Sequence, residues 1–385
     1  MSEVADDTRA AEPVSGTVRR KALHLYEIDV VRILTFACVI GVHVTSHTVA
    51  SNDVALYGLL TLLHFTREVF FALSSFVLIY SYLQKPVPLR KFWPRRFLLV
   101  GVPYVVWSAI YFWSSTLRSP HGTFLDMLGR FAIDLLSGTA WYHLYFLLVT
   151  MQVYLLVPVI LWMVRKARGH HTRLLVISGI VQLILTGIYM YHPQWAPWNG
   201  FKDQFFVSYQ FFIILGAVCA DHQKVLLDWV RTHRRLIALI TALTAIVTIG
   251  VYLLQWMLGL KLYQSGTPLQ PIEMVWAVAV GLGFLAIGSF WAERRKAGGP
   301  LAKAVEIGSD RSFGIFLSHP YVLWVLTLAG NGWLAKTVPT PWLTLVAYIL
   351  VLLGAIIIAE VARRTPLSLP LTGRPYVRRK KPASS

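Results

Sequence analysis

The sequence predicts an all-α polytopic membrane protein of about ten transmembrane helices, with both termini cytoplasmic. Two observations lead to this fold class. The chain of 385 residues is 56% hydrophobic and only 14% charged, with a mean hydropathy of +0.58, whereas about a quarter of the residues of a soluble domain are charged. Its basic residues also gather in alternate connections between the apolar runs, as in multi-pass membrane proteins.

The apolar runs are long enough to cross a bilayer, which takes about 20 helical residues. The second run has the least defined start, because Arg67 and Glu68 lie there. Tryptophan and tyrosine cluster near many of the run ends, as an interfacial belt would. We expect ten spans, over residues 30–49, 66–84, 97–114, 142–164, 173–191, 204–221, 236–256, 272–292, 312–330 and 342–362.

Lysine and arginine set the expected orientation. The two tails and the even-numbered connections hold 29 of them, and the odd-numbered connections hold 5. Such a bias places the basic side in the cytoplasm. Most of the basic residues behind the net charge of +18 then serve to orient the protein and lie near anionic lipid headgroups. No nucleic-acid-binding motif is present, so we expect no nucleic-acid partner.

The chain divides into three expected parts: a polar cytoplasmic tail at 1–23, a membrane domain at 24–363 and a basic cytoplasmic tail at 364–385. The leader has no apolar core and no A-x-A site, which predicts a retained tail and not a cleaved signal peptide. Cys38 and Cys219 both lie in apolar runs and form neither a disulfide framework nor a zinc pattern.

The first span carries charge along one broad face. Its segment "EIDVVRILTFACVIGVHVTSH" contains Asp29, Arg32, His43 and His47. Eleven residues separate Arg32 from His43, so they lie about 20° apart around the helix and about 16 Å apart along it. Arg32 therefore falls near the cytoplasmic boundary and His43 beyond the midplane. Asp29 and Arg32 have an alternative reading as an interfacial pair that reaches water, but His43 is too deep for that.

His43 has three interpretations. Ionisable groups inside a membrane usually serve function, and histidine is the commonest general base. A hydrogen-bonded packing role is the alternative. The i, i+4 spacing of His43 and His47 also suits two metal ligands, but no H-E-x-x-H motif is present. We expect no metal site.

Five segments in order carry a family resemblance. Arg32, ten residues and His43 resemble the R-X10-H signature of the acyltransferase-3 family, which are bacterial integral-membrane O-acyltransferases of cell-surface glycans. The other segments resemble its later motifs over about residues 24–362: "REVFFALSSFVL" (67–78), "KFWPRRFLLVGVPYVVW" (91–107), "AWYHLYFLLVTMQVYLLVP" (140–158) and "SFGIFLSHP" (312–320). Two departures are Ser75 in place of a glycine, and Leu99 where a second basic residue is common.

The resemblance implies an acyltransferase. An acetyl or succinyl group would move from cytoplasmic acyl-CoA, a co-substrate with no permanently bound cofactor, to a hydroxyl of a cell-surface or lipid-linked glycan. The closest branch modifies exopolysaccharide adhesins and enterobacterial common antigen. His43 would be the general base, Glu68 a candidate to orient it, and Arg32 a donor-binding residue. The protein would lie in a bacterial cytoplasmic membrane, with a polysaccharide-synthesis complex as a further candidate partner.

The other catalytic and donor-binding candidates keep more than one interpretation. Arg95 and Arg96 suit the phosphates of acyl-CoA, or serve only the positive-inside topology. Ser74 is a hydrogen-bond donor to the tetrahedral intermediate, an acyl relay, or a helix-packing serine. His319 is a second catalytic candidate at the donor side, and Pro320 after it could distort the helix and open a cavity.

The acceptor side has one candidate pair. Trp141 and Tyr142 begin the fourth span at the outer face, where they either stack on a sugar ring or belong to the aromatic belt.

A polysaccharide exporter or other secondary transporter is the alternative function. A transporter typically shows paired broken helices in two related halves. Here no repeat is evident, and the charged groups cluster toward the first four spans. A purely structural partner of a synthase complex is a third reading, and it leaves His43 unexplained.

Overall fold

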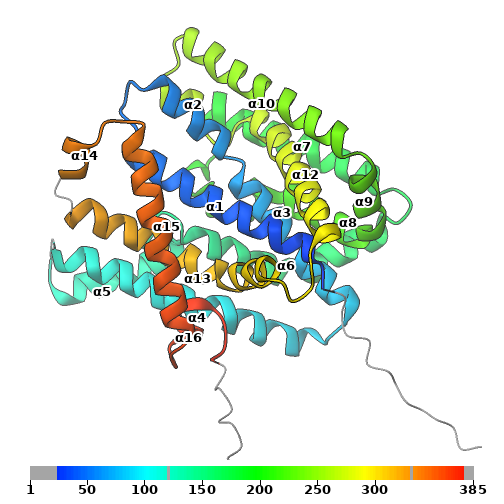
Figure 1. Ribbon diagram of the computed structural model, residues 1–385, viewed down its shortest axis with the longest axis horizontal. Helices are drawn as coiled ribbons and strands as arrows, with labels where there is room; N and C mark the ends of the chain where they lie inside the picture. The colour runs from blue at the N-terminus through cyan, green and yellow to red at the C-terminus, as the bar shows by residue number, and fades with distance from the viewer. Residues whose placement is uncertain (1–23, 119–121, 330–332, 377–385) are drawn as a thin grey trace, which may run out of the picture.

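The computed structural model describes residues 24–118, 122–329 and 333–376, and this part of the chain folds into helices without β-strands (Figure 1). Both the expected leader, 1–23, and the end of the basic tail, 377–385, lie outside the described residues. The long helices are α1 (Tyr26–Thr48), α3 (Thr66–Gln84), α4 (Leu89–Arg118), α6 (Tyr145–Lys166), α7 (His171–Tyr191), α10 (Arg234–Met257), α12 (Pro271–Arg294), α13 (Pro300–Ala329) and α15 (Trp342–Arg363).

Shorter helices complete the bundle. They are α2 (Val54–Leu63), α5 (Phe124–Ser137), α8 (Gln210–Asp221), α9 (Gln223–Thr232), α11 (Leu262–Ser265), α14 (Trp333–Thr337) and α16 (Ser368–Thr372), with 3-10 turns at Pro193–Trp195, Asn199–Phe201 and Phe206–Tyr209.

The all-helical, multi-pass class is confirmed. Within the described ranges, eight helical segments are long and apolar enough to cross a membrane, counting α2 with α3 as one. Taking the α8–α9 pair, bent by 91°, as a further span gives nine. The expected span at 312–330 falls in the second half of α13 and is not among them, so the count of ten stays a prediction.

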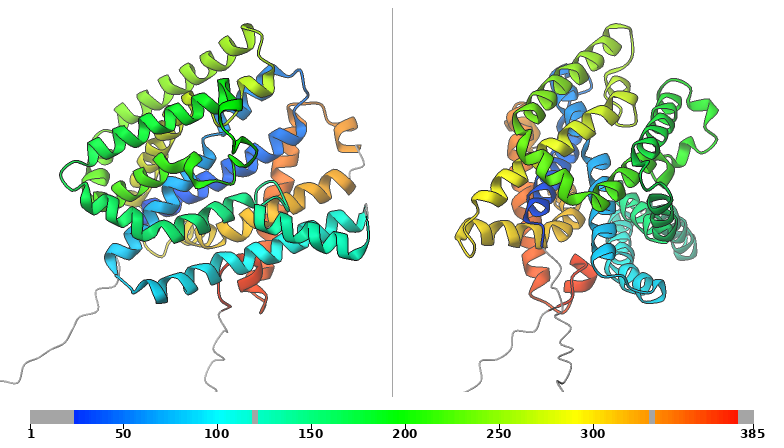
Figure 2. Two further views of the ribbon diagram at one scale, coloured as in Figure 1. Left: turned by 180° about the vertical axis from the view of Figure 1, so that it is seen from behind. Right: turned by 90° about the vertical axis from the view of Figure 1, so that its right-hand side faces the viewer.

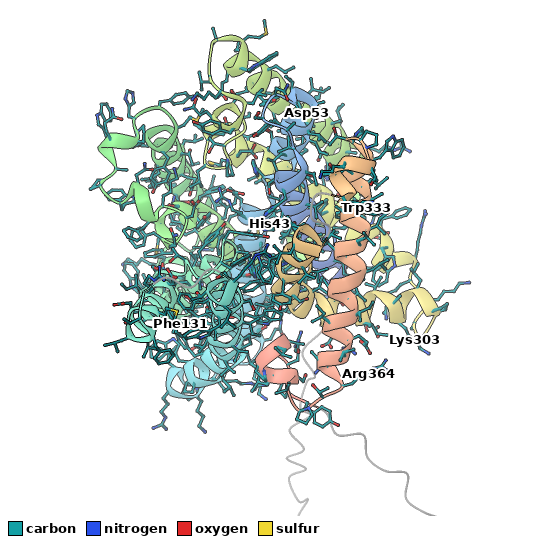
Figure 3. All side chains as sticks on the ribbon, turned by 90° about the vertical axis from the view of Figure 1, so that its left-hand side faces the viewer. His43, Asp53, Phe131, Lys303, Trp333 and Arg364 are labelled. Atoms are coloured by element: carbon teal, nitrogen blue, oxygen red, sulfur yellow. The ribbon has the colours of Figure 1, made fainter. Side chains whose placement is uncertain are left out.

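Helix α1 occupies the centre of the bundle (Figures 1 and 2). It packs against α12, α13 and α15, and also against α2 and α3. Surrounded in this way, α1 buries Asp29, which is only 5% exposed. Figure 3 places His43 in the interior, between Asp53 at one end of the bundle and Arg364 at the other. We call the end with Arg364 the basic end, and the end with Asp53 the far end.

Helices α3 and α8 cross at very close range because small residues meet there. A Cβ atom on Gly216 would lie 2.1 Å from the carbonyl oxygen of Ala72. Next to this contact, the Ser75 hydroxyl donates a 2.6 Å hydrogen bond to the Ile213 carbonyl. Ser75, which stands where the resembling motif has a glycine, therefore fits the crossing and binds the partner helix.

Helix α5 lies outside the expected spans and contains no buried residue. Thr123 and Asp126 form a capping box at its start, and Gly138 ends it in a left-handed conformation. Its exposed apolar side chains include Leu125 and Leu136. An amphipathic helix of this kind suits a position in the membrane interface.

The first part of the expected basic tail is folded. Helix α16 packs against α4, α13 and α15, so residues 364–376 belong to the bundle in addition to the expected membrane domain.

We expect Gly216→Ala to destabilise the protein, because its methyl group must push α3 and α8 apart. Overpacking of this kind costs about 1–3 kcal/mol, which should lower the thermal unfolding midpoint in detergent. Gly250→Ala is the matched control, since no atom would lie within 4 Å of its Cβ. Equal midpoints for both variants would contradict the close crossing.

Candidate active site

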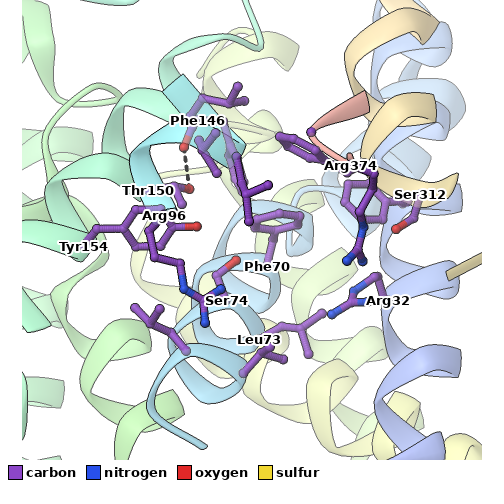
Figure 4. Close-up of a pocket in the computed structure, with 18 residues that line it drawn as sticks. Arg32, Phe70, Leu73, Ser74, Arg96, Phe146, Thr150, Tyr154, Ser312 and Arg374 are labelled. Atoms are coloured by element: carbon purple, nitrogen blue, oxygen red, sulfur yellow. Dashed lines mark hydrogen bonds between the residues drawn. The ribbon is translucent and has the colours of Figure 1, made fainter. Parts of the chain in front are cut away.

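A cavity of about 260 Å³ near the basic end is lined by three arginines, Arg32, Arg96 and Arg374 (Figure 4). They come from α1, from α4 and from the segment after α16. Their guanidinium groups face a common space together with Ser74 and Tyr154. Three positive charges around one cavity favour an anionic ligand with several acceptor oxygens, such as phosphate groups. We call it the arginine cavity.

A short relay holds Arg32 in place. The Ser309 hydroxyl donates a 2.7 Å hydrogen bond to the Asp29 carboxylate and accepts one of 3.1 Å from Arg32. The same carboxylate contacts His24 at 2.5 Å. Arg32 and Asp29 are thus linked through α13, and they do not form the simple water-facing pair that was the alternative interpretation.

Only one arginine of the predicted donor-side pair faces the cavity. Arg96 lines it and lies over the Phe92 ring at 5.5 Å. Arg96 forms no ion pair with any described carboxylate. Arg95 is exposed and outside the lining, which suits its topological interpretation.

Arg374 was assigned to the tail by sequence reasoning, and no local motif marks it as a site residue. Gly373 allows its entry: it adopts a φ of +64°, and a Cβ there would lie 2.6 Å from both the Leu99 carbonyl oxygen and the Phe313 ring. Asp310 lies 3.5 Å from the Arg374 guanidinium and also binds Arg363. The close approach of the chain at Gly373 therefore carries Arg374 to the cavity.

A second cavity, of about 500 Å³, is lined by His43, and we call it the histidine cavity. His43 is half-buried in its wall, with Ser46 and His47 exposed one turn further along α1. The Tyr142 ring lies 4.7 Å from the His43 ring, centre to centre. No described residue forms a hydrogen bond with the His43 imidazole, so its nitrogens are available to a ligand.

His319 lies beside His43 and not among the arginines that line the first cavity, whereas the prediction from the sequence placed it on the expected donor side. The two ring centres are 5.3 Å apart, and His319 is fully buried. Pro320 has no N–H, so the Phe316 carbonyl loses its helical donor. His319 Nδ1 takes that place at 2.7 Å, and α13 continues without a break.

This bond fixes the His319 tautomer. Because Nδ1 carries the proton toward the carbonyl, Nε2 is left as an acceptor, and it has no partner in the described chain. A buried acceptor next to His43 can orient its imidazole by receiving one of its N–H groups.

His143 is a third histidine in this place, next to His319, and it was not among the residues predicted from the sequence. Its ring centre lies 5.8 Å from that of His319 and 5.3 Å from that of Phe316. It is 2% exposed and lines the His43 cavity. The available signal was an ionisable residue inside the quoted segment 140–158, where intramembrane ionisable groups are uncommon.

Glu68 does not line the His43 cavity. It is buried next to Arg67, which does line the cavity and forms a 2.7 Å ion pair with Asp203. The buried carboxylate of Glu273 also lies in this part of the bundle. No contact among the described residues supports the expectation that Glu68 orients His43, and the histidine ring beside His43 is that of His319.

Trp141 and Tyr142 differ in what they offer a ligand. Trp141 stacks on Tyr111 with ring centres 4.9 Å apart, so one of its faces is covered. Tyr142 is 38% exposed and lies in the walls of both the His43 cavity and a neighbouring groove of about 490 Å³. That groove is also lined by polar residues of α4 and α5, namely Ser115, Thr116, Arg130 and Asp134.

One cluster in the described chain has the composition of a metal site: His171, Asp221 and His222. His171 and His222 are already joined by a 2.7 Å hydrogen bond. None of the three lines the cavities around Arg32 or His43.

Comparison with known proteins decides the family. Residues 25–360 match the acyltransferase-3 family model, described as an acyltransferase domain. The chain belongs to the acyltransferase-3 family. No curated protein and no solved structure matches the chain significantly. The protein is therefore a multi-pass membrane acyltransferase.

In this acyltransferase-3 protein the two ends of the R-X10-H signature lie in different cavities. Arg32 lines the arginine cavity, and His43 lines the histidine cavity. Phe146 of α6 lies in the lining of both. The signature thus joins two chemically different sites along one helix.

We expect Gly373→Ala to lower the thermal unfolding midpoint, because the methyl group would collide with the Leu99 carbonyl and the Phe313 ring. A left-handed conformation also costs a non-glycine residue about 1–2 kcal/mol. Gly298→Ala is the control, since it shares a positive φ of 75° but has no atom within 4 Å. A midpoint that falls as much or more in Gly298→Ala would contradict the close approach at Gly373 that carries Arg374 to the cavity.

Proposed function

We propose that this protein transfers a short acyl group, acetyl or succinyl, from cytoplasmic acyl-CoA to a hydroxyl of a cell-surface or lipid-linked glycan. The observation that carries the proposal is the pair of cavities, one lined by arginines and one by histidines, which share the Phe146 side chain. We place the protein in a bacterial cytoplasmic membrane, with the basic end inside. The adhesin and common-antigen branch and a polysaccharide-synthesis complex fit this proposal.

The arginine cavity is the proposed donor site. Acyl-CoA carries several phosphate charges, which match Arg32, Arg96 and Arg374. A cavity of about 260 Å³ is below the usual 300–1,000 Å³ range of pockets for drug-sized ligands. It therefore suits the diphosphate and the narrow arm of the donor, with the adenosine on the basic surface outside. Ser74 then faces the arm and donates a hydrogen bond to the thioester carbonyl.

The histidine cavity is the proposed acceptor site. Its volume of about 500 Å³ is within the range that small ligands occupy. Tyr142 connects it to the polar groove between α4 and α5, so a glycan could extend along this groove with one sugar against the tyrosine ring. Trp141 takes part through its place in the groove wall.

His43 is the proposed general base, and His319 positions it. The acceptor hydroxyl gives its proton to a His43 nitrogen while its oxygen bonds to the thioester carbonyl carbon. The C–S bond then breaks, CoA leaves as a thiolate that takes a proton from water, and His43 returns its proton to solvent. The other His43 nitrogen donates to the free Nε2 of His319 during this step.

We expect Arg96→Gln to weaken CoA binding by about tenfold to a hundredfold, because a hydrogen bond between charged groups contributes about 1.5–3 kcal/mol. Arg95→Gln is the matched control, since Arg95 is exposed outside the cavity. Isothermal titration calorimetry of the purified protein with CoA measures the dissociation constant of each variant. An equal loss of CoA affinity in both variants would show that the general basic charge of this end, and not the cavity, binds the donor.

We expect His43→Gln to lower acyl transfer by about 10²–10⁴-fold, the usual contribution of a general base. The assay uses the purified protein, radiolabelled acetyl-CoA or succinyl-CoA, and a surface-glycan acceptor. His192→Gln, an exposed histidine outside the three cavities described above, should leave the rate unchanged.

Equal label transfer by His43→Gln and the parent would exclude His43 as the base. No transfer from either donor by the parent would favour the alternative, export or another secondary transport.

A further inference from the structure

Four phenylalanine side chains lie between the arginine cavity and the histidine cavity. Each comes from a different helix, and together their rings form a closed cycle of contacts. The centroid distances around the cycle are 5.2 Å for Phe36–Phe70, 4.2 Å for Phe70–Phe146, 5.5 Å for Phe146–Phe316 and 5.6 Å for Phe316–Phe36. We call these four rings the phenylalanine partition.

The partition is about one side chain thick. Phe36 and Phe70 line the arginine cavity, Phe316 lines the histidine cavity, and Phe146 lines both. On α1, Phe36 lies four residues after Arg32 and seven before His43, or about 6 Å and about 10 Å along the helix. The partition therefore crosses the path between the two ends of the signature.

We propose that the phenylalanine partition separates the donor from the acceptor, that only the acyl end of the donor passes between its rings, and that the rings limit the length of the acyl group. This inference rests on the proposed function for the identity of the two ligands. The rings then act as specificity-determining residues and not as catalytic ones.

The chemistry of the rings supports this separation. A layer of apolar rings is a poor environment for phosphate charges and for water, so the nucleotide stays on the basic side. A thioester and a short acyl chain are uncharged, and small rotations of the rings can admit them. Because protein interiors are packed as densely as organic crystals, each added methylene must displace more of the four rings.

The first test measures access and requires no acyl transfer. Ser74→Cys is made in a background with Cys38→Ala and Cys219→Ala, and a charged methanethiosulfonate reagent is added separately to each face of oriented membrane vesicles. We expect labelling from the basic face to be at least about tenfold faster than from the far face, because the rings exclude the charged reagent. Ser46→Cys, exposed in the histidine cavity, should show the opposite preference.

Opening the partition should remove this difference. In the Ser74→Cys protein, Phe146→Ala is expected to admit the reagent from the far face. Phe76→Ala is the matched control, because Phe76 is a buried phenylalanine of α3 that lines neither cavity. Phe146→Leu, a smaller change in volume, tests the same point if the alanine variant does not elute as a single folded species.

The second test measures acyl length. The ratio of hexanoyl to acetyl transfer should rise by about tenfold or more in Phe146→Ala, which is the scale of discrimination by pocket size, and should not change in Phe76→Ala.

Equal labelling of the parent Ser74→Cys from both faces would overturn the partition. So would a Phe146→Ala variant that changes neither the labelling nor the acyl-length ratio. Absence of acetyl transfer by the parent would count against the proposed function, whereas the labelling result would still decide the barrier.

Discussion

The central constraint is the rigid spacing of Arg32 and His43 along one buried helix. Eleven residues of α1 place them about 16 Å apart and close to the same face. Five other helices surround α1, so neither residue can approach the other by bending of the chain. Helix α13 supplies a neighbour to each of the two residues. Ser309 accepts a hydrogen bond from Arg32, and the His319 ring lies beside His43.

Helix α13 therefore organises both cavities, by two different means. Near the basic end it contributes Ser309 and Asp310, which hold Arg32 and Arg374. Beyond the middle of the helix, Pro320 removes a backbone donor, and the His319 ring replaces it. A proline that would otherwise leave a carbonyl unsatisfied inside the bundle instead fixes the tautomer of a buried histidine.

The sequence predicted well the features that depend on one helix. The apolar runs and the basic loops gave the multi-pass helical class, and the helical period put Arg32 and His43 on one face. Features that depend on tertiary contacts could not be predicted. Arg374 reaches its cavity only through the close approach at Gly373, and His143 comes near His43 and His319 from the turn before α6. Glu68 was a candidate to orient His43, but its side chain lies next to Arg67 and does not line the His43 cavity.

The most direct test of this account is a structure of the protein bound to a non-hydrolysable acetyl-CoA analogue. The account predicts phosphate density at Arg32, Arg96 and Arg374, with the arm running past Ser74 and the acyl end among the four phenylalanine rings, directed at His43. Density for the nucleotide in the histidine cavity, or an acyl end directed away from His43, would contradict it.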